Sequence, residues 1–427
     1  MHTGTRSAYF THYKLAKLGS QGRGAGDSYS PLVSYATALS RIGPPFPMPV
    51  RKVGAPLAAI VALGTLTALI LTLLTAVNPG GTVLGFALST TAMVLVLACY
   101  LWLDRWEPEP PRLLVMAFLW GASVAVLTSV LAEHLFGKAF GLGEDSAGEG
   151  AAGGGAADFA SVAIGAPVFE EAAKGAFLLL MMTGRRRNEL NTLTDCLVYA
   201  GITAAGFAWL ENIFYIASGE TLGGSLAIAA LRLVIGPFAH PLFTTMTGIG
   251  VYYALKQRNP LARAAYLLIG YAAAVVMHAL WNGSALLGLK AYVSVYLVWM
   301  APIFGLAIAL AVASRQREQR IVAAKLPVMV SGGLITPFEA AWMSSIPGRK
   351  TAVATAARLG GRRDGKAVKR FALQVVELAY VRDRIDRGFG DERVFALQNE
   401  EAYRVAALRG AAGPALQGLE SSPARRG

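Results

Sequence analysis

The stretch FASVAIGAPVFEEAAKGAFLLLMMT, residues 159–183, places Glu170, Glu171 and Lys174 inside an apolar run long enough to cross a membrane. Each charged side chain at such a depth costs about 2.5–3.5 kcal/mol even on the lowest insertion scales. In a helix Lys174 lies within reach of both acids, three and four residues away. The two acids diverge by roughly 100° around the axis, so they cannot both face one partner. A structural ion pair is possible, but charges at this depth favour a functional site.

The rest of the 427-residue chain is also unlike a soluble domain, because 54% of its residues are apolar and 15% are charged. The apolar residues cluster into stretches of about the length that a bilayer requires. These stretches are 54–77, 82–103, 113–132, 159–183, 193–217, 225–255, 264–286 and 291–314. The pattern predicts an all-α, polytopic bundle of about eight transmembrane helices. The two cysteines, Cys99 and Cys196, both lie in apolar stretches and suggest neither a disulfide framework nor a metal pair.

Basic residues predict the domain organisation and the topology. We expect a flexible cytoplasmic arm at 1–52, a membrane domain at 53–314 and a basic cytoplasmic tail at 315–427. The loops that follow even-numbered spans are rich in Lys and Arg, whereas those after odd-numbered spans hold only Lys138 and Lys290. This alternation predicts that both termini are cytoplasmic. It also explains the net charge of +13 without a nucleic-acid partner.

Two further segments carry expectations of their own. The loop from Glu133 to Asp158 contains five acids and one Lys and should lie outside the cell. The tail has an amphipathic helical pattern over about 366–387, with Phe371 on its apolar side. This part of the tail is either a small helical appendage or a helix lying on anionic lipid, and the end of the chain should be disordered.

The charged and histidine residues of the membrane stretches fall in four consecutive segments. These residues are Glu170, Glu171, Lys174, Asp195, Glu211, Arg232, His240 and His278. Such a distribution predicts one polar site in the middle of the bundle. We expect Asp195 to support a helix start near the cytoplasmic end, and Arg232 to pair with Glu211 in a structural role.

The carboxylates and histidines at this depth suit two kinds of water activation. A Zn²⁺ ion takes His and carboxylate ligands, here His240, His278 and Glu211, with another Glu as the general base. Alternatively, a Glu activates water without a metal, while His278 and Asn282 stabilise the oxyanion from one helical face. In both schemes Glu170 or Glu171 is the expected base or ligand, and Lys174 orients an acid.

The order of these motifs resembles that of the PrsW family of intramembrane proteases. The motif EExxK appears as Glu170-Glu171-x-x-Lys174, and a second motif appears as Phe207-x-x-x-Glu211-Asn212. The later histidine motifs resemble Ala239-His240-Pro241-Leu242-Phe243 and Met277-His278-Ala279-Leu280-Trp281-Asn282, and an acidic-proline signature resembles Asp104-Arg105-Trp106-Glu107-Pro108-Glu109-Pro110. The agreement runs from about Leu103 to Asn282 and leaves out the arm and the tail.

The resemblance implies an intramembrane protease, usually described as a metalloprotease, although a metal-free glutamate mechanism is argued for relatives. It implies that membrane-anchored proteins are the substrates, notably anti-sigma factors, and that the location is the bacterial plasma membrane. Catalytic roles would fall on Glu170, Glu171, Glu211, His240 and His278, supported by Lys174, Phe207 and Asn282.

Two functions of other classes remain open from the residues alone. Buried Glu and His side chains also serve as proton relays in transporters, although carriers commonly show inverted repeats and none is clear here. A non-enzymatic receptor or scaffold would use the same polar cluster to hold its helices together.

Overall fold

The structure is a computed structural model, and it describes residues 55–140 and 159–422. Within these ranges every regular element is a helix, as the apolar pattern predicts. The chain divides into two compact units, residues 51–318 and a tail unit that begins at residue 319, and we describe each unit by itself. The arm at 1–52 and the glycine-rich run of the expected outer loop lie outside the described residues.

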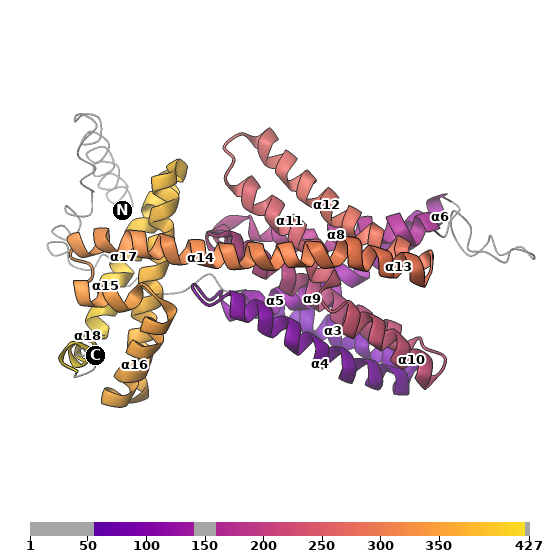
Figure 1. Cartoon of the computed structure of the whole chain (residues 1–427), viewed down its shortest axis with the longest axis horizontal. Helices are drawn as coiled ribbons and strands as arrows, with labels where there is room; N and C mark the ends of the chain where they lie inside the picture. Colours follow the sequence, from indigo (N-terminus) through magenta and orange to yellow (C-terminus); the bar gives the residue numbers. More distant parts are fainter. Residues whose placement is uncertain (1–54, 141–158, 423–427) are drawn as a thin grey trace, which may run out of the picture. The chain divides into compact units, whose positions relative to one another are not determined.

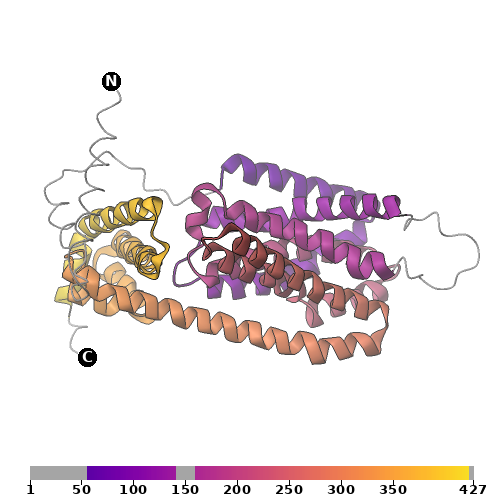
Figure 2. The same cartoon turned by 90° about the horizontal axis from the view of Figure 1, so that it is seen from above.

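The membrane unit is a bundle of long helices (Figure 1), and several of these helices are interrupted by a π-helical turn. Its elements are α3 (Leu57–Val77), α4 (Pro79–Leu103), α5 (Pro111–Trp120), η1 (Gly121–Ala125), α6 (Val126–Phe140), η3 (Ser161–Gly165), α8 (Ala166–Met181), η4 (Gly184–Glu189), α9 (Leu193–Ala217), α10 (Leu222–Ala229), η5 (Ala230–Ile235), α11 (Ala239–Leu255), α12 (Pro260–Leu286), α13 (Leu289–Val295), η6 (Tyr296–Met300) and the first part of α14 (Ala301–Ser331), whose residues from 319 onward belong to the tail unit. Figure 2 shows the helices of this unit lying lengthwise beside one another.

Among the described residues, seven helices are long and apolar enough to cross a membrane, and they cover seven of the eight expected stretches. The remaining stretch, 159–183, forms η3 and α8, and its Glu170, Glu171 and Lys174 set it apart from the apolar seven. One boundary differs from the expectation. The third span runs over Pro111–Lys138 rather than ending at residue 132, so Glu133 belongs to a helix and not to the outer loop.

Helix α9 is the centre of the bundle, since 94% of the residues in its 18-residue apolar stretch are buried. It packs against α4, α5, η1, α8 and α11. Small residues make these close crossings possible. A methyl group on Gly206 of α9 would overlap the carbonyl oxygen of Phe118, and one on Gly121 of η1 would overlap that of Thr203. The polar residues of α9 are therefore held at fixed positions inside the bundle.

A second glycine contact joins α11 to α12. A Cβ atom on Gly250 would lie 3.0 Å from the Cα atom of Gly270, and one on Gly270 would lie 2.8 Å from the Cα atom of Gly250. Both helices also carry a histidine of the expected site, His240 on α11 and His278 on α12. Because the two backbones touch, the two imidazoles are brought to the same depth of the bundle.

The acidic-proline loop between α4 and α5 closes one end of the bundle. The Asp104 carboxylate accepts a hydrogen bond from the Glu109 backbone N–H at 2.8 Å, and the Tyr199 hydroxyl donates to Glu109 at 2.7 Å. Burial, reinforced by the negative charges of Asp195 and neighbouring acids, raises the pKa of Glu109 well above its usual range. Tyr199 lies twelve residues before Glu211 on α9, or about 18 Å along the helix, so we assign this loop a structural role.

The tail unit is a small helical assembly of α15 (Pro337–Met343), α16 (Ile346–Arg384), η7 (Ile385–Phe389), α17 (Glu392–Ala411) and α18 (Gly413–Ser421). The apolar side of the expected amphipathic segment is buried at Phe371, Val375, Val376, Leu378 and Ala379. Helix α16 packs against α17 and α18, and Arg409 of α17 pairs with Glu339 of α15 at 3.0 Å. Because other helices cover this apolar side, the structure favours the helical appendage over a helix lying on lipid.

Candidate active site

Helix α8 carries the acid pair into the interior of the bundle, where it packs against α6, α9, α11 and α12. Glu171 and Lys174 are fully buried, and Glu170 is 7% exposed. Lys174 Nζ donates to Glu170 Oε2 at 3.0 Å and to Glu171 Oε1 at 2.9 Å. The helical spacing predicts that Lys174 reaches either acid, and the structure shows that it holds both.

Lys174 also contacts residues of other helices. Its Nζ atom lies 3.1 Å from His240 Nδ1 and 3.8 Å from the centre of the Phe207 ring. The ring faces the ammonium with its negative π surface, an attractive arrangement for a desolvated cation. Phe207, expected to be a supporting residue, therefore contacts the Lys174 ammonium with the face of its ring.

Glu171 is the most completely engaged carboxylate of the site. Its Oε1 accepts from Lys174 and lies 3.1 Å from His278 Nδ1, and its Oε2 accepts from the Thr244 hydroxyl at 2.7 Å. With Nδ1 of His278 turned to Glu171, the Nε2 atom of the same ring faces Glu170. Glu171 thus fixes the orientation of His278, and the ring of Phe243 stacks on that imidazole at 4.7 Å.

Glu211 plays the corresponding part for His240. Its Oε2 lies 2.7 Å from His240 Nε2 and accepts from Arg232 at 2.5 Å. Arg232 in turn donates to Asn212 at 2.6 Å and lies over the Tyr215 ring. The expected pairing of Arg232 with Glu211 is confirmed. It leaves the Nδ1 atom of His240 directed toward Glu170 and Lys174.

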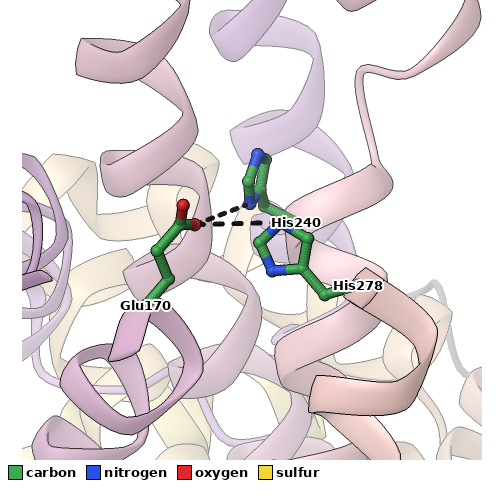
Figure 3. A group of neighbouring side chains, drawn as sticks. All are labelled: Glu170, His240 and His278. Atoms are coloured by element: carbon green, nitrogen blue, oxygen red, sulfur yellow. Dashed lines mark ion pairs between the residues drawn. The ribbon is translucent and has the colours of Figure 1, made fainter. Parts of the chain in front are cut away.

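Three groups converge at the centre of these contacts (Figure 3). Glu170 Oε2 lies 3.9 Å from His240 Nδ1 and 3.8 Å from His278 Nε2, and one ligand atom from each of the three residues lies within 4.8 Å of the others. Each imidazole is held at its other nitrogen by a separate carboxylate, Glu171 or Glu211. Metal-binding histidines are commonly oriented in this way by a carboxylate.

The donor set fits a catalytic zinc site. Two imidazole nitrogens and one carboxylate oxygen are a known ligand set for catalytic zinc, with the fourth position open for water. Tetrahedral zinc bonds would bring the ligand atoms to roughly 3.3 Å from one another. The separations in this structure, 3.8 Å, 3.9 Å and at most 4.8 Å, would therefore have to shorten by about 0.5–1.5 Å. The set differs from the expected one, since Glu170 takes the place of Glu211, whose carboxylate is bound to Arg232 and to the far side of His240.

Asn282 was expected near the site but makes its contact elsewhere, whereas Asp195 was expected at a helix start and lies there. Asn282 donates to the carbonyl of Val162 in η3 at 3.2 Å, rather than joining His278. Asp195 forms a capping box with Thr192 at the start of α9, which agrees with the expected helix-start role. The oxyanion pair of His278 and Asn282 is thus not assembled in this structure.

Thr244 belongs to the site and Glu133 lies on a helix that packs against α8, but neither is predicted as a site residue from the sequence. Thr244 follows His240 by one helical turn, a spacing that places both on the same face of α11 and could have revealed it. Glu133 is half-buried on α6, the helix that packs against α8. Its helix meets α8 where the rings of Phe136 and Phe169 lie 5.5 Å apart. Glu133 was hidden because it follows the apparent end of an apolar stretch.

Comparison with known proteins agrees with this geometry. A sequence model of the PrsW family, described as PrsW family intramembrane metalloprotease, matches residues 109–307. The matched region includes the three converging residues, both orienting carboxylates and Lys174. No curated protein and no solved structure matches the chain.

Proposed function

Because residues 109–307 match the sequence model of the PrsW family of intramembrane metalloproteases, we propose that this chain hydrolyses membrane-anchored proteins at Glu170, His240 and His278. The observation that carries the proposal is the convergence of these three side chains from α8, α11 and α12 on one point. All three are buried. Peptide hydrolysis inside a membrane needs such a cluster, because water must be bound and activated away from bulk solvent.

Glu170, His240 and His278 are the residues that would hold a metal, and we propose Zn²⁺. When bound, zinc would supply a Lewis acid and lower the pKa of a water molecule. Glu211 and Glu171 keep the two imidazoles turned toward the centre, and the Phe243 ring keeps His278 from rotating. Losing such an orienting partner typically costs about 10–100-fold in metal affinity or activity.

The metal-free alternative uses the same convergence. Glu170 would then take the proton from a water molecule held beside His240 and His278, and the imidazoles, once protonated at the nitrogens that face the centre, would stabilise the developing oxyanion. Glu170 suits this role better than Glu171, because both oxygens of Glu171 already accept hydrogen bonds from Lys174 and Thr244. Glu170 is therefore the central residue of both versions.

We propose proteins anchored by a membrane-spanning segment as substrates, anti-sigma factors among them. The support is the location of the site in a bundle whose outer side chains are large and apolar on α3, α12 and α14. Such a surface faces lipid and meets a substrate that is itself in the bilayer.

The test is cleavage by the purified full chain in liposomes. We expect it to cut a reporter that has one membrane-spanning segment and to leave the same reporter intact when that segment is removed. A chelator should stop the reaction and Zn²⁺ should restore it if the metal version holds. Persistence of cleavage in chelator would select the metal-free version, whereas no cleavage under any condition would contradict the protease function.

We also propose a plasma-membrane location with both termini in the cytoplasm. The support is the excess of Lys and Arg after alternate spans, with α8 counted as a crossing. Reporter fusions after Arg187 and after Gly427 should both read as cytoplasmic, and a fusion within 141–158 should read as external. An external signal from the C-terminal fusion would overturn this topology.

A further inference from the structure

Lys174 contacts two of the three atoms that converge in the site. Its Nζ atom lies 3.0 Å from Glu170 Oε2 and 3.1 Å from His240 Nδ1, and these atoms belong to the group able to hold a metal. A third contact, to Glu171 at 2.9 Å, completes its shell. An ammonium group has three hydrogens to donate, so all three are matched by acceptors.

We propose that Lys174 and a divalent metal ion are alternative cations of this site, and that Lys174 sets how tightly the metal binds. The proposal rests on the metal version of the function above. In the arrangement described here, the positive charge between Glu170 and His240 is the lysine's own. Metal binding requires Lys174 to withdraw from both atoms.

Lys174 and a divalent metal cannot both bind the Nδ1 atom of His240 at the same time. The Nε2 atom of His240 faces Glu211 at 2.7 Å, which places the ring proton there and leaves Nδ1 with one lone pair. That lone pair either accepts a hydrogen bond from Lys174 or binds a metal, but it cannot do both. The competition at His240 Nδ1 therefore follows from valence as well as from charge repulsion.

Burial strengthens the competition. Lys174 and Glu171 are both fully buried, so water screens the lysine charge little and repulsion of a nearby divalent ion is strong. Lys174 also keeps one partner when a metal binds, because Glu171 is not one of the three residues that would hold the metal. Its flexible four-carbon stem can keep that contact while releasing the other two.

The test measures Zn²⁺ affinity directly. The full chain is purified in detergent, stripped with a chelator and titrated with Zn²⁺ against a chromophoric competitor, as wild type, Lys174→Met and Lys325→Met. Lys325 is a matched control, since it also forms a lysine–carboxylate pair, with Asp386 at 2.9 Å in the tail unit. We expect Lys174→Met to bind Zn²⁺ at least tenfold more tightly than wild type, and Lys325→Met to match wild type. Equal or weaker binding by Lys174→Met would overturn the proposal.

A second variant covers the risk that Lys174→Met unfolds, because removing one partner of a buried ion pair is strongly destabilising. The double variant Lys174→Met with Glu171→Gln removes one charge of each sign and should also bind Zn²⁺ more tightly than Glu171→Gln alone. In both lysine variants, added Zn²⁺ should raise the melting temperature more than in wild type, because the metal replaces the missing cation.

The outcome separates this proposal from the proposed function. Reporter cleavage by wild type, with no Zn²⁺ binding by wild type or by either lysine variant, would overturn the competition and leave the protease standing on its metal-free version. Tighter Zn²⁺ binding by the variants, with no cleavage by wild type, would support the competition and contradict the protease.

Discussion

Glu170→Gln is expected to abolish cleavage of a membrane-anchored reporter while the protein still accumulates in the membrane. Glutamine keeps the size of the side chain but cannot take a proton and is a poor metal ligand, so both versions of the mechanism lose their central group. Loss of a general base typically lowers a rate by about 10²–10⁴. The measurement is the rate of reporter cleavage in liposomes, normalised to the amount of folded protein.

Glu171→Gln should abolish cleavage by a different route. Its carboxylate orients His278 and balances Lys174, and a neutral amide does neither well. Replacing Glu211, His240 or His278 by Ala should also inactivate the enzyme, since each belongs to the same connected group. Glu220→Gln is the matched control, because Glu220 is exposed in the loop before α10 and should keep full activity. Full cleavage by both Glu170→Gln and Glu171→Gln would reduce the acid pair to a structural role.

Gly206→Ala is expected to lower the stability of the whole bundle. The added methyl group would overlap the carbonyl oxygen of Phe118, which is backbone and cannot turn aside. Overpacking of this kind costs about 1–3 kcal/mol or more. Gly121→Ala should act likewise at the neighbouring contact with Thr203. Both variants should show a lower melting temperature in detergent and reduced accumulation in the membrane.

Gly305→Ala is the control for this prediction. Gly305 is also helical, on α14, but a Cβ atom there would meet nothing within 4 Å. Alanine favours a helix over glycine by about 1 kcal/mol, so this variant should be as stable as wild type or slightly more stable. Equal stability of Gly206→Ala and Gly305→Ala would show that the contact between α5 and α9 is looser than described.

The sequence was sufficient to predict the helices and the contacts of Lys174 with the two neighbouring acids, because both depend on local spacing. Apolar runs of membrane length predict the spans, and the three- and four-residue spacing predicts that Lys174 meets Glu170 and Glu171. The roles within the site were less predictable. Whether Glu170 or Glu211 joins the two histidines depends on which nitrogen of each ring faces inward, and that is decided by the packing of α8, α9 and α11 against one another.

Residues at the edge of a pattern were the hardest to assign. Glu133 follows an apolar stretch and precedes an acidic one, so composition alone placed it in a loop, whereas the helix continues to Phe140. Asn282 shares a helical face with His278, but the close contact of α12 with η3 gives it the carbonyl of Val162 as a partner. For Asn282, a neighbouring helix that is distant in sequence decides the outcome.

Because α8 carries three charges within its apolar run, it enters a bilayer by itself only at a high cost in free energy. Each charge costs about 2.5–3.5 kcal/mol during insertion, and only Lys174 and the two acids can offset one another before other helices arrive. The partners Thr244, His240 and His278 lie on α11 and α12, which are synthesised later. We therefore expect the helices to enter the membrane in a fixed sequence. Helix α8 should remain loosely held at the translocon until the C-terminal half of the bundle has been synthesised. A ribosome-stalled chain ending near residue 220 should show α8 still accessible to water-soluble reagents.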